Sequence, residues 1–266
     1  MESAQAEMPC GDAKWEAQTG EWSRMVDTRQ TKIRVLLFGQ AREIAGRQDI
    51  ELTLEGTPTV GAAFDLVKAR HPKLGQMERS LLFAVNESYA GRSESLKSGD
   101  VLAVLPPVSG GEPAVSTIPD DSGDFFQITR ESIDIGELRA RLLGGESGAV
   151  VIFDGVARDN SKGRRTLFLE YEGYTEMALS TFRQIGREAH EQWPISRIGI
   201  IHRLGRVDIS QSSVVIVVTS PHRKHAFEAC RFAIDTLKRI APIWKKEYFE
   251  DGAVWVEGEQ NRDAGD

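Results

Sequence analysis

The first part of the chain carries short apolar runs separated by polar and turn residues. Runs rich in Ile, Val, Leu and Phe predict strands at 33–39, 49–54, 81–86 and 101–105. Between the second and third run, Thr59 is a suitable cap for a helix with one apolar face, and His71-Pro72 ends that helix. Residues 41–46 are expected to be a short connecting turn. The order strand, strand, helix, strand, strand predicts a small α+β unit in which one sheet grasps one helix.

The remainder of the chain alternates between strand-like and helix-like patterns. Predicted strands cover 148–156, 166–172, 197–205, 212–220 and 253–258, and predicted helices cover 175–193 and 221–240. Such alternation is typical of an α/β domain, so we expect a mixed sheet with two main helices on one face. The first domain is expected to cover residues 32–111 and the second 125–258.

Three segments lack any apolar periodicity. Residues 112–124 contain two prolines, two serines and three aspartates, which predicts a linker. Residues 1–31 are polar and are expected to be a disordered extension, the alternative being an ordered arm that docks through Trp15 and Trp22. Residues 259–266 are expected to form a short tail.

Charge and cysteine content restrict the class of protein. The formal charge of the 266 residues is -7 with both signs interspersed, so no nucleic-acid partner is expected. The only cysteines, Cys10 and Cys230, are far apart in the sequence, which suits a reducing compartment without disulfides. No apolar run approaches the length of a membrane span and no signal peptide is evident. We therefore expect a soluble cytoplasmic protein with no membrane contact.

The start of the predicted 221–240 helix is a candidate anion site. Ser220 is expected as its N-cap and Pro221 as its first residue. His222 and Arg223 then lie in the first turn, where free backbone N–H groups already favour an anion. Basic residues there oppose the helix dipole, so a bound phosphate or carboxylate explains them better than helix stability does. The alternative is that both face solvent or a neighbouring acid.

Two lysines flank the end of the same helix. Lys238 lies in the last turn and Lys245 follows Pro242 in an extended segment, so the two could converge on one pocket. A lysine beside another cation or in an apolar wall has a lowered pKa and acts as a nucleophile or acid/base. The alternative for both is a solvated surface position. Cys230 belongs to the apolar stripe of this helix and is expected to be buried and structural.

The loop after the predicted strand 148–156 is a further candidate anion-binding element. It contains four basic residues, of which Arg158 is nearest to the strand end. They either close over an anionic substrate or form an ordinary solvated loop. His222 and His225 share a helical face, but no other residue at ligand spacing joins them, so no metal is expected. Neither a dinucleotide-binding nor a P-loop motif occurs, and no cofactor is expected.

Together these segments resemble molybdopterin synthase, with both of its subunits in one chain. Residues 32–111, from KIRVLLFGQAREIAG to GDVLAVLPPVSGG, resemble the small sulfur-carrier subunit, a ubiquitin-like β-grasp protein. Residues 125–258, with GAVVIFDGVARDN, IHRLGRV, TSPHRKHAFEA and LKRIAPIWKKE, resemble the large catalytic subunit. The resemblance implies a β-grasp carrier domain joined to a catalytic domain.

The resemblance also implies a sulfur transfer. In that family a separate enzyme adenylates the carrier's terminal glycine, which becomes a thiocarboxylate and enters the large subunit's pocket. Its sulfur then passes in two rounds to cyclic pyranopterin monophosphate and forms the dithiolene of molybdopterin. Carried onto this chain, Gly111 is the sulfur-bearing residue, Gly110 is its slim neighbour, and Lys238 and Lys245 match the essential lysines. The family's substrate-binding positions are matched by Arg158, His222, Arg223, Lys246 and Glu247. The large subunit is typically a homodimer with pockets near its interface, so a homodimer is expected.

The diglycine departs from the family pattern, because Gly111 is joined to Glu112 instead of ending the chain. An amide cannot be adenylated. One hypothesis is a precursor that is cut after Gly111 in the linker. A second is a catalytic unit served by a separate carrier, with the fused domain as a docking or inhibitory module. A third, which conflicts with the two matched lysines, is a non-enzymatic protein that recruits the adenylating enzyme.

Overall fold

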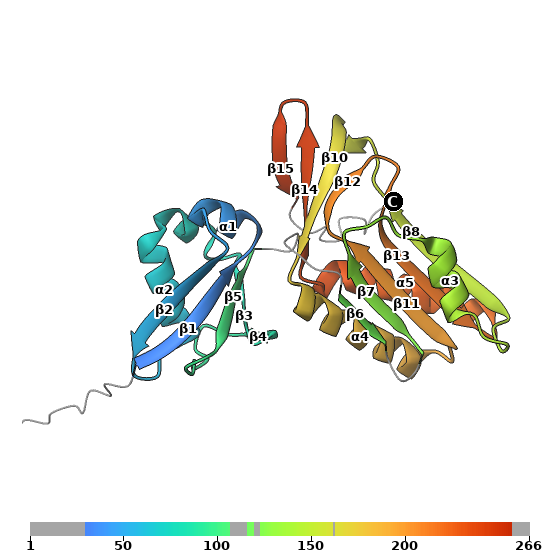
Figure 1. Cartoon of the computed structure of the whole chain (residues 1–266), viewed down its shortest axis with the longest axis horizontal. Coiled ribbons are helices and arrows are strands. Elements are labelled where there is room, and N and C mark those ends of the chain that lie inside the picture. The colour runs from blue at the N-terminus through green and yellow to red at the C-terminus, as the bar shows by residue number, and fades with distance from the viewer. Residues whose placement is uncertain (1–29, 107–115, 120–122, 162, 257–266) are drawn as a thin grey trace, which may run out of the picture.

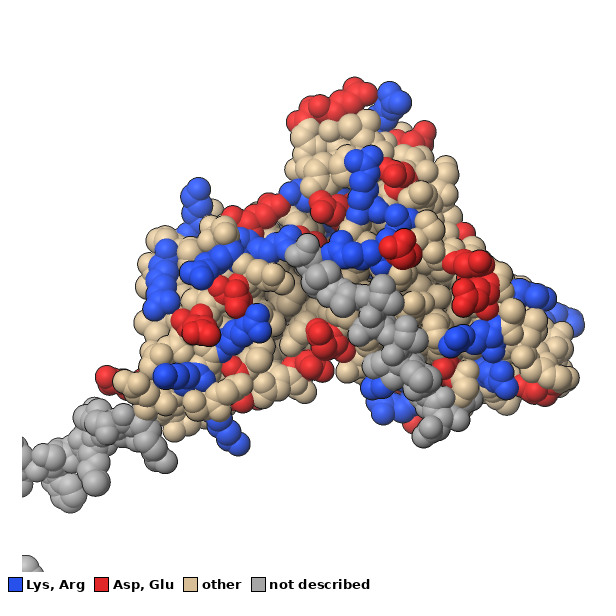
Figure 2. All heavy atoms as spheres, in the orientation of Figure 1, with Lys and Arg blue, Asp and Glu red and all other residues tan. Residues whose placement is uncertain are grey.

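The computed structural model describes residues 30–106, 116–119, 123–161 and 163–256, which form two units side by side (Figure 1). Residues 1–29 of the predicted 1–31 extension, the diglycine Gly110-Gly111 and the predicted tail lie outside the described residues. On the face seen in Figure 2, acidic side chains lie among the basic ones on both units.

The first unit is one sheet that holds a helix. Its strand order is β2-β1-β5-β3-β4, with β1 and β5 parallel and the other neighbours antiparallel. The Thr59 hydroxyl accepts a hydrogen bond from the backbone N–H of Ala62 at 3.2 Å, which confirms the predicted cap. The predicted apolar face of the helix is buried against the sheet. In chain order the elements are β1 (Gln30–Leu37), α1 (Gly39–Ala45), β2 (Asp49–Glu55), α2 (Val60–Arg70), a 3-10 helix (Pro72–Met77), β3 (Leu82–Val85), β4 (Ser88–Ala90) and β5 (Val101–Leu105).

Two predictions for the first unit were wrong. The turn expected at 41–46 is helix α1, which ends at Gly46 in the left-handed conformation (φ 68°). Its few apolar residues, Ala41, Ile44 and Ala45, pack against the core and stabilise a helix too short to show a clear period. Strand β1 begins at Gln30, so it includes the last two residues of the predicted 1–31 extension.

The second unit contains two sheets. One has the order β6-β7-β11-β13-β8 and is mixed, because β7 and β11 are parallel. The other has the order β12-β10-β14-β15, and its paired strands are antiparallel. In chain order the elements of the second unit are β6 (Ser116–Pro119), β7 (Phe125–Thr129), α3 (Ile135–Leu142), β8 (Ala149–Val156), β9 (Asn160–Ser161), β10 (Arg164–Gly173), α4 (Thr175–Gln192), β11 (Arg197–Arg203), β12 (Gly205–Asp208), β13 (Ser212–Ser220), α5 (Arg223–Ile240), β14 (Ile243–Phe249) and β15 (Gly252–Val256).

Helices cover both faces of the mixed sheet. As predicted, α4 and α5 cover one face, where they bury alternate residues of β11 and β13 such as Ile200 and Ile216. The other face carries α3, which the sequence prediction missed, with Leu138 and Leu142 against Val215. The second sheet was also missed, because the run at 197–205 was taken as one strand. It breaks at Gly205, whose φ of 78° starts β12 in a new direction.

The predicted linker at 112–124 is partly a strand. Backbone groups of Ser116–Pro119 pair antiparallel with Phe125–Thr129, with Ser116 opposite Ile128. The edge of a sheet offers unpaired N–H and C=O groups, and pairing with them requires no apolar pattern in the added strand. The segment that follows the diglycine is therefore bound to the second unit.

Apolar contacts join the two units. The Phe38 ring stacks on Tyr174 and Trp244 at centroid distances of 5.2 and 5.6 Å. Ala84, Ala103 and Leu105 complete the cluster from the first unit. The indole N–H of Trp244 donates to the carbonyl of Pro106 at 2.8 Å. The end of the first unit's last strand is thus fixed to β14 of the second unit.

Polar contacts flank this cluster. The Glu172 carboxylate accepts from the backbone N–H of Gly39 at 3.0 Å and pairs with Arg42. The Lys246 ammonium pairs with Glu43. Burial raises the pKa of Glu172 from 4.5 to about 7, against the opposing effects of Arg42 and of the Gly39 hydrogen bond. This carboxyl group therefore makes the stability of the folded chain depend on pH.

Because of Glu172, the free energy of unfolding of the chain is expected to fall as pH rises. Its protonated form is favoured in the folded state, so its contribution is fully present below pH 4.5 and is lost as pH rises through about 7. The raised pKa corresponds to about 3 kcal/mol over that window. Calorimetric unfolding of the chain at several pH values should show this loss, and Glu172→Gln should remove it because an amide does not titrate. An identical pH dependence in the variant would contradict the assignment.

Candidate functional site

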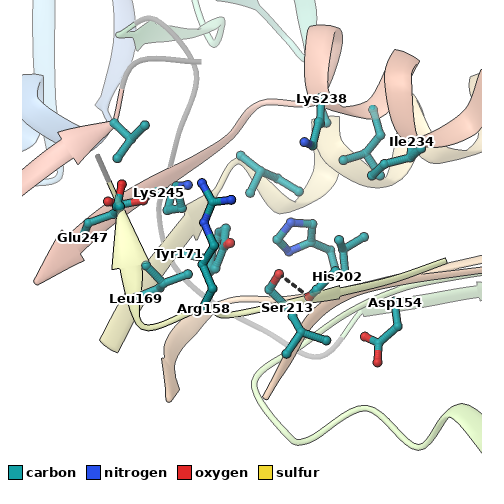
Figure 3. Close-up of a pocket in the computed structure, with 18 of the residues that line it drawn as sticks. Asp154, Arg158, Leu169, Tyr171, His202, Ser213, Ile234, Lys238, Lys245 and Glu247 are labelled. Atoms are coloured by element: carbon teal, nitrogen blue, oxygen red, sulfur yellow. Dashed lines mark hydrogen bonds and ion pairs between the residues drawn. The ribbon is translucent and has the colours of Figure 1, made fainter. Parts of the chain in front are cut away.

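A cavity of about 400 Å³ lies in the second unit between the mixed sheet, helix α5 and the β10–β14 pair (Figure 3). Its walls come from segments far apart in the sequence. Phe153, Leu169, Ile234, Leu237 and Ile243 supply apolar surface. Charged and polar side chains point into the cavity from several elements, so the cavity combines an apolar wall with ionic groups.

Three cations converge on this cavity. Arg158 comes from the loop after β8, Lys238 from the last turn of α5, and Lys245 from β14. The Arg158 guanidinium makes no hydrogen bond or ion pair with any other residue that the structure describes. Arg164 and Arg165, the first residues of β10, pair instead with Asp251 and Glu250. The cavity therefore suits an anionic ligand.

Strand alternation decides which residues of β14 reach the cavity. Side chains on successive strand residues point to opposite faces, so Ile243, Lys245 and Glu247 share one face and all line the cavity. The Lys245 ammonium lies 3.0 Å from Oε1 of Glu247, a buried carboxylate. This ion pair fixes the position of the lysine head group.

The other face of β14 holds the first unit. Trp244 contacts Phe38 and Pro106, and Lys246 pairs with Glu43. Lys246, predicted to bind substrate, therefore lies away from this cavity. The paired strand β10 alternates in the same way, with Leu169 and Tyr171 lining the cavity and Glu172 facing the first unit. A single pair of strands thus separates the cavity from the first unit.

His222 and Arg223 lie at the opposite end of α5 from Lys238 and do not line this cavity. Both are exposed. The predicted cap was wrong: the helix begins at Arg223 after His222, and Ser220 is the last residue of β13. The Ser220 hydroxyl instead accepts from the backbone N–H of His222 at 3.3 Å. Lys238 follows Arg223 by fifteen positions along the helix, a rise of about 22 Å.

Sequence reasoning missed several residues of the cavity. His202, Tyr171, Thr166 and Ser213 all line it. Of these, His202 carried a signal, because it is a polar residue at the alternate position that follows Ile198 and Ile200 in β11. The Ser213 hydroxyl donates to the carbonyl of Gly155 at 2.9 Å and so holds strand β8 at the rim.

Cys230 lies in the core beneath α5, as predicted. It is 3% exposed, and burial raises the pKa of its thiol to about 11. The thiolate is the nucleophilic form of cysteine, so this residue is structural.

The described part of the chain contains no group of three or more His, Cys, Asp or Glu side chains that could hold a metal ion. Within those same residues, no helix combines the length and apolar character that crossing a membrane requires.

Comparison with known proteins assigns each unit to a family. Residues 35–111 match the ThiS family, and residues 128–240 match the MoaE protein family. Molybdopterin synthase catalytic subunits from Halalkalibacterium halodurans and Staphylococcus carnosus are 45% and 48% identical to this chain over 131 residues. These matches cover 49% of this chain and 84% and 87% of the two relatives. The crystal structure of molybdopterin synthase from Staphylococcus aureus is 42% identical with a TM-score of 0.48. The match covers 52% of this chain and 98% of the Staphylococcus aureus chain.

The extent of these matches settles the family. The second unit aligns with most of the length of the catalytic subunits, and the first unit is matched by a separate family model that ends at Gly111. The chain therefore belongs to the molybdopterin synthase catalytic subunit (MoaE) family, with a ThiS-family sulfur-carrier domain fused in front of the catalytic domain.

Proposed function

We propose that this chain transfers sulfur from a thiocarboxylate on Gly111 to cyclic pyranopterin monophosphate, after cleavage of the Gly111–Glu112 bond. The observation that carries the proposal is the convergence of Arg158, Lys238 and Lys245 on one cavity directly behind the strands that hold the carrier domain. Each of two rounds converts one terminal thiocarboxylate into a carboxylate and adds one sulfur to the substrate. The test is whether the cut chain, bearing the thiocarboxylate, converts this substrate to molybdopterin.

The position of Pro106 supports delivery by the chain's own tail. Its carbonyl is held by Trp244, and the ThiS-family match ends five residues later at Gly111. Five extended residues span about 17 Å, and a single pair of strands separates the first unit from the cavity. Glycines at the tip leave the tail slim. Before transfer, a separate adenylating enzyme has to act on the freed Gly111 carboxylate.

The roles of the cavity residues follow from their charges. Arg158 presents a planar fork of donors suited to a phosphate. Lys238 and Lys245 are placed to stabilise the negative charge that develops on the tail's carbonyl oxygen and to transfer protons. Glu247 holds Lys245 at 3.0 Å. Lys246 binds the carrier domain through Glu43 and not the substrate.

His222 and Arg223 can join the same substrate only from a second copy of the chain, because they lie at the far end of α5. We therefore assign a homodimer in which each cavity uses these two residues of its partner. Mixing two inactive variants, Lys238→Ala and Arg223→Ala, should then restore roughly one quarter of the wild-type activity. Half of the randomly assorted dimers are mixed, and each mixed dimer has one intact site.

The matched control mixes Lys238→Ala with Lys245→Ala. Both lysines line the cavity of the same chain, so every site lacks one of them and activity should stay absent. Recovery in this control, or no recovery with Arg223→Ala, would contradict the composite site.

A further inference from the structure

His202 is a polar residue in an apolar row of β11. It follows Ile198 and Ile200 on the face that α4 and α5 cover, and it is 4% exposed. An aliphatic side chain would fill such a position without needing hydrogen bonds. A buried imidazole is costly unless its nitrogens find partners.

The protein itself satisfies one nitrogen. Nδ1 of His202 lies 2.9 Å from the carbonyl oxygen of Arg203, and because a carbonyl only accepts, Nδ1 carries the proton. Burial lowers the pKa of His202 to about 4, so the ring is neutral near pH 7 and Nε2 is an acceptor. The Tyr171 ring contacts the imidazole edge to face at a centroid distance of 5.2 Å and fixes its orientation.

The second nitrogen has no partner in the protein. Nε2 forms no hydrogen bond with any other residue that the structure describes, and the ring lines the cavity between Lys238 and Ser213 (Figure 3). Arg158 and the two lysines can only donate hydrogen bonds. Glu247 is already paired with Lys245, and Figure 3 shows Asp154 turned away from the other labelled side chains. His202 therefore gives the cavity a neutral acceptor that is fixed in place.

We propose that Nε2 of His202 accepts a hydrogen bond from an N–H or O–H group on the ring system of the substrate, while the cations bind its phosphate. This inference rests on the proposed function, in which the substrate is a pyranopterin phosphate, a ring system that carries such donors. Cations alone would accept many phosphates of suitable size. A buried acceptor discriminates among them, because a ligand without a matching donor leaves Nε2 unsatisfied.

The test is titration calorimetry of the full chain with two probes, cyclic pyranopterin monophosphate and inorganic phosphate. His202→Phe keeps a flat ring against Tyr171 but lacks the acceptor, and should weaken binding of the pterin about 10-fold or more while leaving phosphate binding unchanged. His202→Gln places an amide oxygen near the position of Nε2 and should remain within about threefold of wild type. Lys238→Ala should weaken binding of both probes.

The outcomes separate this inference from the proposed function. Unchanged pterin binding by His202→Phe would overturn the inference alone, whereas a wild-type chain that does not bind the pterin would overturn the proposed function and the inference with it. The ¹⁵N resonance of Nε2 in the wild-type chain provides a readout that does not depend on the folding of a variant. It should shift when the pterin binds and not when phosphate binds, and a resonance unmoved by bound pterin would overturn the inference.

Discussion

Replacing Lys245 by alanine is expected to lower the rate of molybdopterin formation by about 10³-fold. Its ammonium lies in the cavity and is held at 3.0 Å by the buried Glu247, so no other cation of β14 can take its place. The measurement is a single-turnover assay of the chain supplied as residues 1–111 and 112–266, with the first piece thiocarboxylated and in saturating amount, because this isolates the chemical step from carrier binding. Circular dichroism of the variant would confirm that the fold is kept.

The neighbouring lysine provides the matched control. Lys246 lies on the opposite face of β14 and pairs with Glu43, so Lys246→Ala should keep the rate within about threefold at saturating carrier and weaken carrier binding. Lys224, an exposed lysine at the start of the same α5 helix that carries Lys238, should tolerate alanine with no effect. Equal losses for Lys245→Ala and Lys246→Ala would contradict the assignment of the two strand faces.

A chain that cannot be cut between Gly111 and Glu112 is expected to make no molybdopterin by itself. The carbonyl of Gly111 is then an amide, which the adenylating enzyme cannot activate. The same sequence supplied as two pieces, residues 1–111 and 112–266, should be active with that enzyme, ATP and a sulfur source. The comparison is made by fluorescence detection of oxidised molybdopterin in both samples.

Adding a separate thiocarboxylated carrier to the uncut chain tests the alternative that the catalytic domain is served by a carrier from another chain. The fused domain occupies the docking face through Phe38 and Pro106, so the uncut chain should respond weakly to an added carrier. Full activity of the uncut chain with added carrier would favour a catalytic unit served in trans. Activity of the uncut chain without any added carrier would contradict the proposal that the chain has to be cut after Gly111.

Much of the fold could be predicted because strands and long helices leave a periodic apolar pattern. The α2 cap at Thr59, the apolar stripe of α5 and the mixed sheet all followed from that pattern. Short elements such as α1 and α3 were missed, since seven or eight residues carry little periodicity. Strand β6 was missed because it is held by backbone pairing to a sheet edge, which leaves no trace in side-chain pattern.

The site could be predicted only in part, for a different physical reason. Arg158, Lys238 and Lys245 stand out as basic residues near the predicted end of a strand or a helix, and the structure brings them to one cavity. Which of two adjacent lysines faces the cavity depends on the pleat of β14, and that depends on how it pairs with β10. The role proposed for His202 depends on the backbone carbonyl of Arg203, which lies 2.9 Å from Nδ1 and which no sequence pattern encodes.

Intact-mass analysis of the protein purified from its native host shows directly whether the Gly111–Glu112 bond is cut. If the chain is cut to free its carrier, the sample contains a chain that ends at Gly111, part of it with one terminal oxygen replaced by sulfur, together with a second chain that begins at Glu112. Only full-length chain, in cells that are still making molybdopterin, would contradict the proposed cleavage.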